Sequence, residues 1–198
     1  MHLYIIILYV STGITIPLIL MAWDRRPSRG ATALGLFLLC TGIASFSYAM
    51  NLTSTTLPQK IFWNHAEYLG GAFLTSLMLV ISMIFTGHEK WVRPVPMTLI
   101  FVLPVLTLLA NWANPWHHLF YSRIWIEPSG PYVVLAKDRG PLYGLVFAYF
   151  YAMTGTALFL IFRALKRPLK SSSAPQLLLL MTAFLLPILF NLPYTLRL

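Results

Sequence analysis

Two adjacent histidines near the middle of the chain are the residues whose type first suggests chemistry. His117 and His118 lie in the segment 114–120, NPWHHLF, directly after a long apolar run. Imidazole suits zinc or copper, but zinc sites use three or four ligands at recurrent spacing, and the chain has no HxxxH, CxxC or HExxH pattern. We therefore expect no metal. Two interpretations stay open: the pair caps the end of a helix, or it recognises an outside ligand or pH.

A carboxylate inside an apolar segment is the second candidate for chemistry. Glu67 is the only acidic residue within the predicted membrane spans, and a charge at mid-bilayer costs at least about 2.5–3.5 kcal/mol on insertion scales. It stands near the start of the long span 61–87, so we expect it close to the outer interface, neutral or hydrogen-bonded. Polar residues share its side of the helix, namely Asn64, Glu67, Tyr68, Gly71, Thr75 and Ser82. This stripe either holds helices together or forms a responsive site.

Signatures of enzymes are absent from the sequence. There is no nucleophile elbow, no P-loop and no pair of carboxylates with a nearby base. No lysine lies in the middle of a predicted span, so a retinal Schiff base has no candidate. We therefore expect neither catalysis nor a bound cofactor.

Membrane-spanning helices must position these residues. The 198 residues are 58% hydrophobic and 10% charged, whereas soluble domains carry about 25% charged residues. Apolar windows of roughly 20 residues, enough to cross the hydrocarbon core, predict an all-α integral membrane protein of one domain over residues 1–198. Its six predicted spans are 3–23, 31–50, 61–87, 96–112, 141–165 and 176–196. The basic residues that give the net charge of +9 cluster at the ends of the predicted spans. We therefore attribute them to membrane orientation and expect no nucleic-acid partner.

The distribution of basic residues predicts the orientation. Nine of the fourteen Lys and Arg residues lie in the loops 24–30, 88–95 and 163–175, which are therefore expected in the cytoplasm, with the N-terminus outside. With six spans, the C-terminus would also lie outside. The long connection 113–140 is then external. Its short β-prone runs around PSGP predict a small β-hairpin over the outer mouth of the bundle.

Taken in order, the motifs resemble the N-terminal seven-transmembrane sensor region of bacterial histidine kinases, over nearly the whole chain. The matching pieces are AEYLGG at 66–71, TG at 86–87, NPWHHLF at 114–120, RGPLY at 139–143, and Pro187, Asn191 and Tyr194. There are departures from the family pattern. The third span lacks the expected proline, and the segment SSSAPQ lacks an arginine beside Gln176. The family pattern has seven spans followed by a kinase, whereas this sequence has six predicted spans and no kinase motifs.

The resemblance implies a sensory input module of a two-component type of system, in the inner membrane of a bacterium. It would detect an extracellular or membrane-borne signal and act on a kinase or cyclase, and a homodimer is a further partner to consider. The alternative is a small transporter or channel subunit that uses the polar stripe of the third span as its pathway.

Site residues follow from the stripe and from the matched motifs. Ligand binding or sensing is expected at Asn64, Glu67, Tyr68, Trp116, His117, His118 and Asn191. Structural roles are implied for Gly70, Gly87, Asn114, Pro141 and Pro187.

Overall fold

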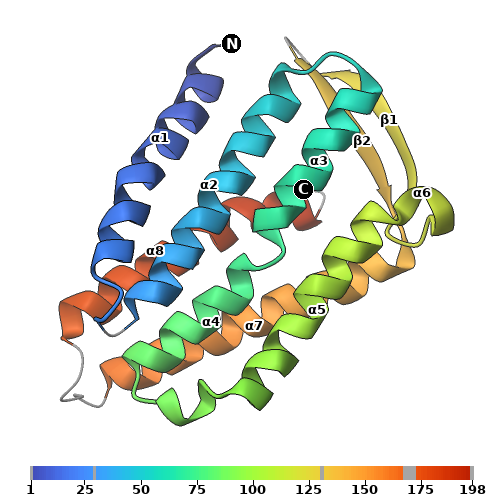
Figure 1. The fold of residues 1–198 in the computed structure, drawn as a ribbon. Coiled ribbons are helices and arrows are strands. Elements are labelled where there is room, and N and C mark those ends of the chain that lie inside the picture. Colours follow the sequence, from blue (N-terminus) through green and yellow to red (C-terminus); the bar gives the residue numbers. More distant parts are fainter. Residues whose placement is uncertain (1, 29, 130–131, 167–172, 197–198) are drawn as a thin grey trace.

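Long helices that run alternately in opposite directions make up most of the structure, a computed structural model that describes residues 2–28, 30–129, 132–166 and 173–196 (Figure 1). The helices and strands, in chain order, are α1 His2–Asp24, α2 Ala31–Thr53, α3 Leu57–Gly71, α4 Leu74–Phe85, the 3-10 turn η1 Glu89–Trp91, α5 Pro94–Trp112, α6 Asn114–His117, β1 Tyr121–Ser129, β2 Tyr132–Arg139, α7 Pro141–Leu165 and α8 Ala174–Leu196.

Five stretches of the described chain are long and apolar enough to cross a membrane. They are Leu3–Asp24, Ala31–Thr53, Leu57–Phe85, Pro94–Trp112 and Pro141–Leu165, and the segment Ala174–Pro187 of α8 is a shorter apolar helix. The prediction of a mostly helical membrane protein is confirmed. Of the six predicted spans, five have such a stretch, and the sixth coincides with a helix that contains only the shorter apolar segment.

The third predicted span, 61–87, falls on the apolar stretch Leu57–Phe85, which the structure divides into two helices. Its helix ends at Gly71 and a new one begins at Leu74, and Figure 1 shows the chain stepping sideways between them. Glycine is a weak helix former, and Gly70 packs so tightly on α2 that a side-chain carbon there would collide with the Cys40 carbonyl oxygen. The pair Gly70–Gly71 therefore allows close packing of α2 and α3 and also allows the break.

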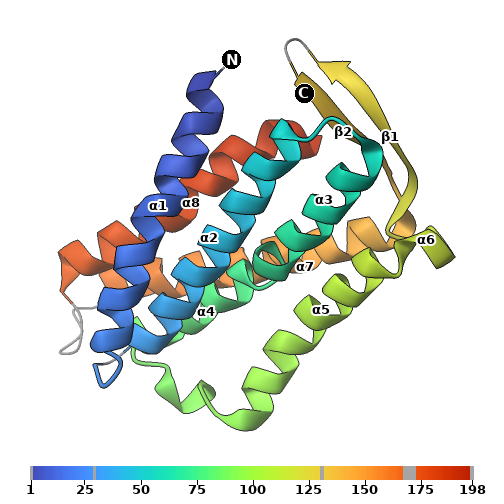
Figure 2. The same ribbon diagram turned by 45° about the horizontal axis from the view of Figure 1, so that its top comes forward.

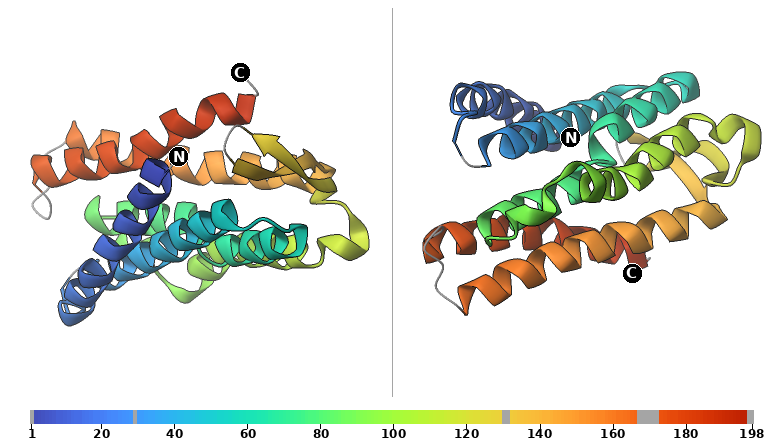
Figure 3. Two further views of the ribbon diagram at one scale, coloured as in Figure 1. Left: turned by 90° about the horizontal axis from the view of Figure 1, so that it is seen from above. Right: turned by 60° about the horizontal axis from the view of Figure 1, so that its bottom comes forward.

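The apolar core is centred on α4. Met78, Leu79, Val80 and Ile81 are buried against α7 and α8, where Ala157, Ile161, Ala164, Leu177 and Phe184 face them. Two views in Figure 3 show α7 and α8 along one flank and α2 and α3 along the other. Helix α1 packs on α2, and its many exposed apolar residues are suited to contact lipid.

A β-hairpin between α6 and α7 confirms the hairpin predicted for the long connection. Strands β1 and β2 are antiparallel, with Tyr121 opposite Arg139 and Ile124 opposite Lys137. The hairpin, with strands of 9 and 8 residues, is longer than the short element expected. It lies at the end of the bundle where α1 begins and where α2 passes into α3 (Figure 2), and β2 contacts both α2 and α3.

Candidate functional site

A polar cavity of about 310 Å³ lies between α3, the base of the hairpin and α7. We call it the polar cavity. Helix α3 contributes Asn64, Glu67, Tyr68 and Gly71, the hairpin contributes Tyr121, Lys137 and Arg139, and α7 contributes Tyr143, Phe147 and Phe150. The site thus joins α3 to the hairpin and α7, which follow it about 50 or more residues later in the sequence.

Glu67 and Lys137 stand where the polar cavity meets a second cavity. Both residues also line a space of about 780 Å³ between α1, α2 and β2. Burial lowers the pKa of the Lys137 ammonium below its ordinary value, while the nearby Glu67 carboxylate acts in the opposite direction. The Lys137 ammonium also lies 4.9 Å from the centre of the Tyr121 ring. A carboxyl group from α3 and an amine from β2 therefore line the same two cavities.

Aromatic residues hold the hairpin against α3 and α7. The hydroxyls of Tyr68 and Tyr121 are 2.8 Å apart, and Phe120 packs edge-on against Tyr68 at 5.5 Å and Tyr143 at 5.7 Å. Burial, together with Tyr68, Tyr143 and Glu67, raises the pKa of Tyr121 well above its usual value. Tyr121 is therefore a neutral phenol at physiological pH, able to donate or accept a hydrogen bond.

Arg139 places a second cation at the base of the hairpin. Its guanidinium lies 5.2 Å from the Tyr143 ring centre and 5.9 Å from that of Phe147, a geometry suited to cation–π attraction. The next residue, Gly140, leaves no room for a side chain, because a Cβ would collide with the Leu119 carbonyl. The last residue of β2 is thus held close to the start of α7.

The two histidines of NPWHHLF are used differently. The Leu119 N–H donates to Nδ1 of His117 at 2.9 Å, and Nε2 of the same ring lies 3.1 Å from the Ala110 carbonyl. A backbone N–H can only donate, so Nδ1 accepts and Nε2 carries the proton that it donates to Ala110. His118 instead adopts a left-handed backbone, with φ 53°, at the end of α6. Both ring nitrogens of His117 are therefore engaged with the main chain.

Asn114 fixes the start of the hairpin. Its Oδ1 accepts hydrogen bonds from the Phe120 and Tyr121 N–H groups at 3.1 and 2.8 Å, and its Nδ2 donates to the Tyr121 carbonyl at 3.0 Å. The side chain is buried, with 3% exposed. These three hydrogen bonds, all made by one side-chain amide, hold Tyr121 beside Tyr68.

The structure brings only some of the predicted site residues together. Asn64, Glu67 and Tyr68 line the polar cavity, whereas His118 lines a different space of about 350 Å³ that it shares with Asn64. Trp116 is 86% exposed, and His117 faces the end of α5. The side chain of Asn191 lies outside the described part of the structure.

The residues expected to be structural occupy helix ends and close contacts. Gly70 packs on α2, Gly87 has φ +79° just after α4, and Pro141 is the first residue of α7, where proline is favoured. Pro187 lines two cavities from α8.

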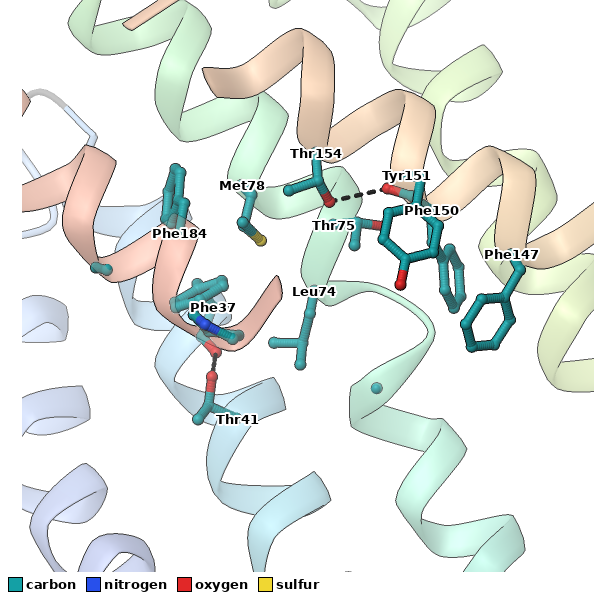
Figure 4. A pocket seen from close by; sticks show the side chains of 13 residues that line it. Phe37, Thr41, Leu74, Thr75, Met78, Phe147, Phe150, Tyr151, Thr154 and Phe184 are labelled. Carbon is teal, nitrogen blue, oxygen red and sulfur yellow. Dashed lines mark hydrogen bonds between the residues drawn. The ribbon is translucent and has the colours of Figure 1, made fainter. Parts of the chain in front are cut away.

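A further space, of about 520 Å³, adjoins the polar cavity deeper in the bundle. We call it the apolar cavity. Figure 4 shows Phe37, Leu74, Met78 and Phe184 around it, with Thr154 and Tyr151 on α7. Gly71, Phe147 and Phe150 belong to both spaces. Sequence reasoning missed this cavity, and it also missed Tyr121, Lys137 and Arg139, because strand register places them.

The groups around the polar cavity are suited to binding a ligand. Among the described residues, no group of three or more His, Cys, Asp or Glu side chains could hold a metal ion. The polar cavity offers a carboxylate, two cations and phenol hydroxyls, which can recognise a polar ligand.

Comparison with protein families gives one result. A family model described as the N-terminal 7TM region of histidine kinase matches residues 7–198. No curated protein and no solved structure matches the chain.

Proposed function

Because the chain belongs to the family of N-terminal seven-transmembrane regions of histidine kinases, a sensory input region, we propose that it binds its signal in the polar cavity. The sequence contains no kinase domain. We infer that its output is a cytoplasmic histidine kinase or cyclase, and that it lies in the inner membrane of a bacterium.

The shared position of Glu67 and Lys137, which line the same two cavities, is the observation that carries this proposal. A carboxylate on a membrane helix and an ammonium on a hairpin strand line the same two cavities, so a ligand that contacts either group changes how the hairpin sits on α3. Charged groups at membrane depth are functional candidates. A ligand with different affinities for two hairpin positions would shift the population between them.

The break between α3 and α4 supplies a route for transmission. Ala72 is fully buried there, and Gly71 lines the polar cavity. Irregular backbone within a bilayer is tolerated where protein buries it or where it lines a cavity. If α3 moves together with the hairpin, the angle between α3 and α4 can therefore change without opening the core around Met78 and Ile81.

The arrangement of loops supports an external hairpin. The connections between α1 and α2 and between α4 and α5 lie at the end opposite the hairpin (Figure 1), and they carry Arg25, Arg26, Lys90 and Arg93. Basic loops favour the cytoplasmic side. We therefore infer that the N-terminus and the polar cavity face the outside.

The proposal is tested in a bacterium that carries the gene, by complementing its deletion with variants. Phosphorylation of the host response regulators is followed on phosphate-affinity gels. Glu67→Gln and Lys137→Met are expected to change the phosphorylation pattern, whereas Glu89→Gln and Arg123→Gln, which change exposed residues, are expected to keep it. Wild-type phosphorylation in both cavity variants would overturn the assignment.

The transporter alternative uses the same stripe and makes a different prediction. A pathway would have to continue past Met78, Leu79 and Ile81, which are buried in the apolar core. Ion and solute flux in proteoliposomes separates the two functions, since a sensor should carry none.

A further inference from the structure

The apolar cavity lies among the membrane helices. Its walls come from α2, α7, α8 and both sides of the break between α3 and α4. Its volume of about 520 Å³ falls in the range of small-molecule sites, roughly 300–1,000 Å³. No charged residue is among those that line it in the described part of the chain. The cavity is therefore suited to an uncharged molecule.

Aromatic rings form much of the lining. Figure 4 shows Phe37 and Phe184 on one side of the cavity, and on the other side Phe147, Phe150 and Tyr151. Phe37 of α2 and Phe184 of α8 contact each other, with ring centres 6.0 Å apart. Aromatic rings attract one another in offset and edge-on arrangements. A ligand that contains a ring would therefore find packing partners on both sides of the cavity.

One hydroxyl in the cavity lacks its usual partner because of the helix break. Thr41 and Thr154 each donate to the carbonyl four residues earlier, at 2.8 Å. Thr75 stands four residues after Gly71, but α3 ends at Gly71 and α4 begins only at Leu74. The buried Thr75 hydroxyl has no hydrogen-bond partner among the described residues, and a buried donor without an acceptor is destabilising. Threonine adopts two rotamers in a helix, so this hydroxyl can turn toward an oxygen of a ligand.

The cavity is open beside α8. Ala183 and Pro187 line it and are also exposed, and α8 packs mainly on α7. Exposed positions on an apolar helix of a membrane bundle contact lipid. A ligand would therefore enter from the bilayer, which also favours an uncharged molecule.

We propose that the apolar cavity binds an uncharged, ring-containing molecule that dissolves in the bilayer and carries an oxygen that accepts a hydrogen bond from Thr75. The ring lies between Phe37 and Phe184 on one side and Phe150 on the other. The site does not use the charged groups of the polar cavity, so this inference does not depend on the proposed sensory function.

Photo-labelling with competitors tests the proposal. The full chain in phosphatidylcholine nanodiscs is irradiated with trifluoromethyl phenyl diazirine, an uncharged aryl probe, and labelled peptides are identified by mass spectrometry. Acetylnaphthalene, a neutral ring ketone, should reduce labelling of α4 and α8 around Met78 and Phe184 and leave labelling of α1 unchanged. Ethylnaphthalene has a similar shape without the oxygen. It should compete about fivefold less well, the factor expected for one neutral hydrogen bond.

Each competitor can overturn one part of the proposal. Equal competition by ethylnaphthalene would overturn the hydrogen bond to the ligand, and equal competition by naphthoate would overturn the preference for a neutral molecule. Equal competition by dodecanol would overturn the ring. Labelling around Met78 and Phe184 that none of these compounds reduces would overturn the site.

Matched variants locate the hydrogen bond and the opening. Thr75→Val removes the hydroxyl and should make acetylnaphthalene and ethylnaphthalene compete equally, whereas Thr156→Val, at an exposed α7 position, should keep their difference. Ala183→Phe places a ring in the opening and should abolish the competed labelling. Ala152→Phe, exposed on α7 and outside the cavity lining, should keep it. A ketone preference that survives in Thr75→Val would overturn the role of Thr75.

Discussion

The hydroxyls of Tyr68 and Tyr121 lie 2.8 Å apart and join α3 to the first residue of the hairpin, 53 positions further along the chain. Asn114 holds the backbone of Phe120 and Tyr121 with three hydrogen bonds, so one tyrosine is fixed by the hairpin base and the other by a membrane helix. The hydrogen bond between them therefore couples the hairpin to the helix that carries Glu67.

Removing either hydroxyl should loosen the hairpin. We expect Tyr68→Phe and Tyr121→Phe each to lower the free energy of unfolding by about 0.5–1.5 kcal/mol, the usual contribution of a hydrogen bond. The double variant should lose less than the sum, because both changes remove the same bond. Thermal unfolding in micelles measures these values, with Tyr4→Phe at an exposed position on α1 as control. Strict additivity would show that the two hydroxyls are not coupled.

Neighbouring glycines at the end of α3 should respond in opposite ways to alanine. Gly70→Ala sets a methyl group against the Cys40 carbonyl and should lower the free energy of unfolding by about 1–3 kcal/mol, as overpacking does. Gly71→Ala meets nothing within 4 Å and should be neutral or stabilising by up to about 1 kcal/mol, because alanine favours helix. Chemical unfolding of both variants provides the comparison. If both variants lost the same free energy of unfolding, close packing of α2 and α3 would not be what requires glycine at position 70.

Composition and hydropathy were sufficient to predict the helices, because a bilayer requires about 20 apolar residues for each crossing. The hairpin was also predictable, since β-prone runs flank a Pro/Gly/Ser turn. The break at residues 72–73 was not predicted. Hydropathy is unchanged through it, and the pair Gly70–Gly71 marks both a weak helix and a close contact with α2, which only the packing distinguishes.

Only the part of the candidate site that lies on α3 was predicted from the sequence. The 3.6-residue period placed Asn64, Glu67 and Tyr68 on one face of the third span. Lys137 and Arg139 come from β2, and a shift of one residue in strand register would turn both away. Sequence spacing does not set that register. His117 was expected near the site from its motif, but its two ring nitrogens are engaged by the backbone around α6.

Replacing His117 should affect stability more than sensing. His117→Phe loses the bonds to the Leu119 N–H and the Ala110 carbonyl and should lower the free energy of unfolding by roughly 1–3 kcal/mol. His118→Gly should raise it by about 1 kcal/mol, because glycine adopts a left-handed backbone without strain. Response-regulator phosphorylation, normalised to the amount of folded protein, should stay at the wild-type level in both. A changed signal at normal folded amounts would assign His117 to sensing.

Lys137 should make stability depend on pH in the alkaline range. Burial lowers the pKa of Lys137 in the folded protein, so the unfolded chain binds more protons at this residue. The free energy of unfolding therefore rises with pH until the pH reaches the pKa of lysine in the unfolded chain, about 10.4. The difference in unfolding free energy between wild type and Lys137→Met should therefore grow as pH increases from about 7.5 to 9.5. Taking the difference cancels the contribution of Tyr121, whose pKa is raised by burial in both proteins. Lys137→Arg, which stays charged throughout, should show no such increase. A constant difference across this range would show that the Lys137 ammonium is well solvated rather than enclosed between the hairpin and Glu67.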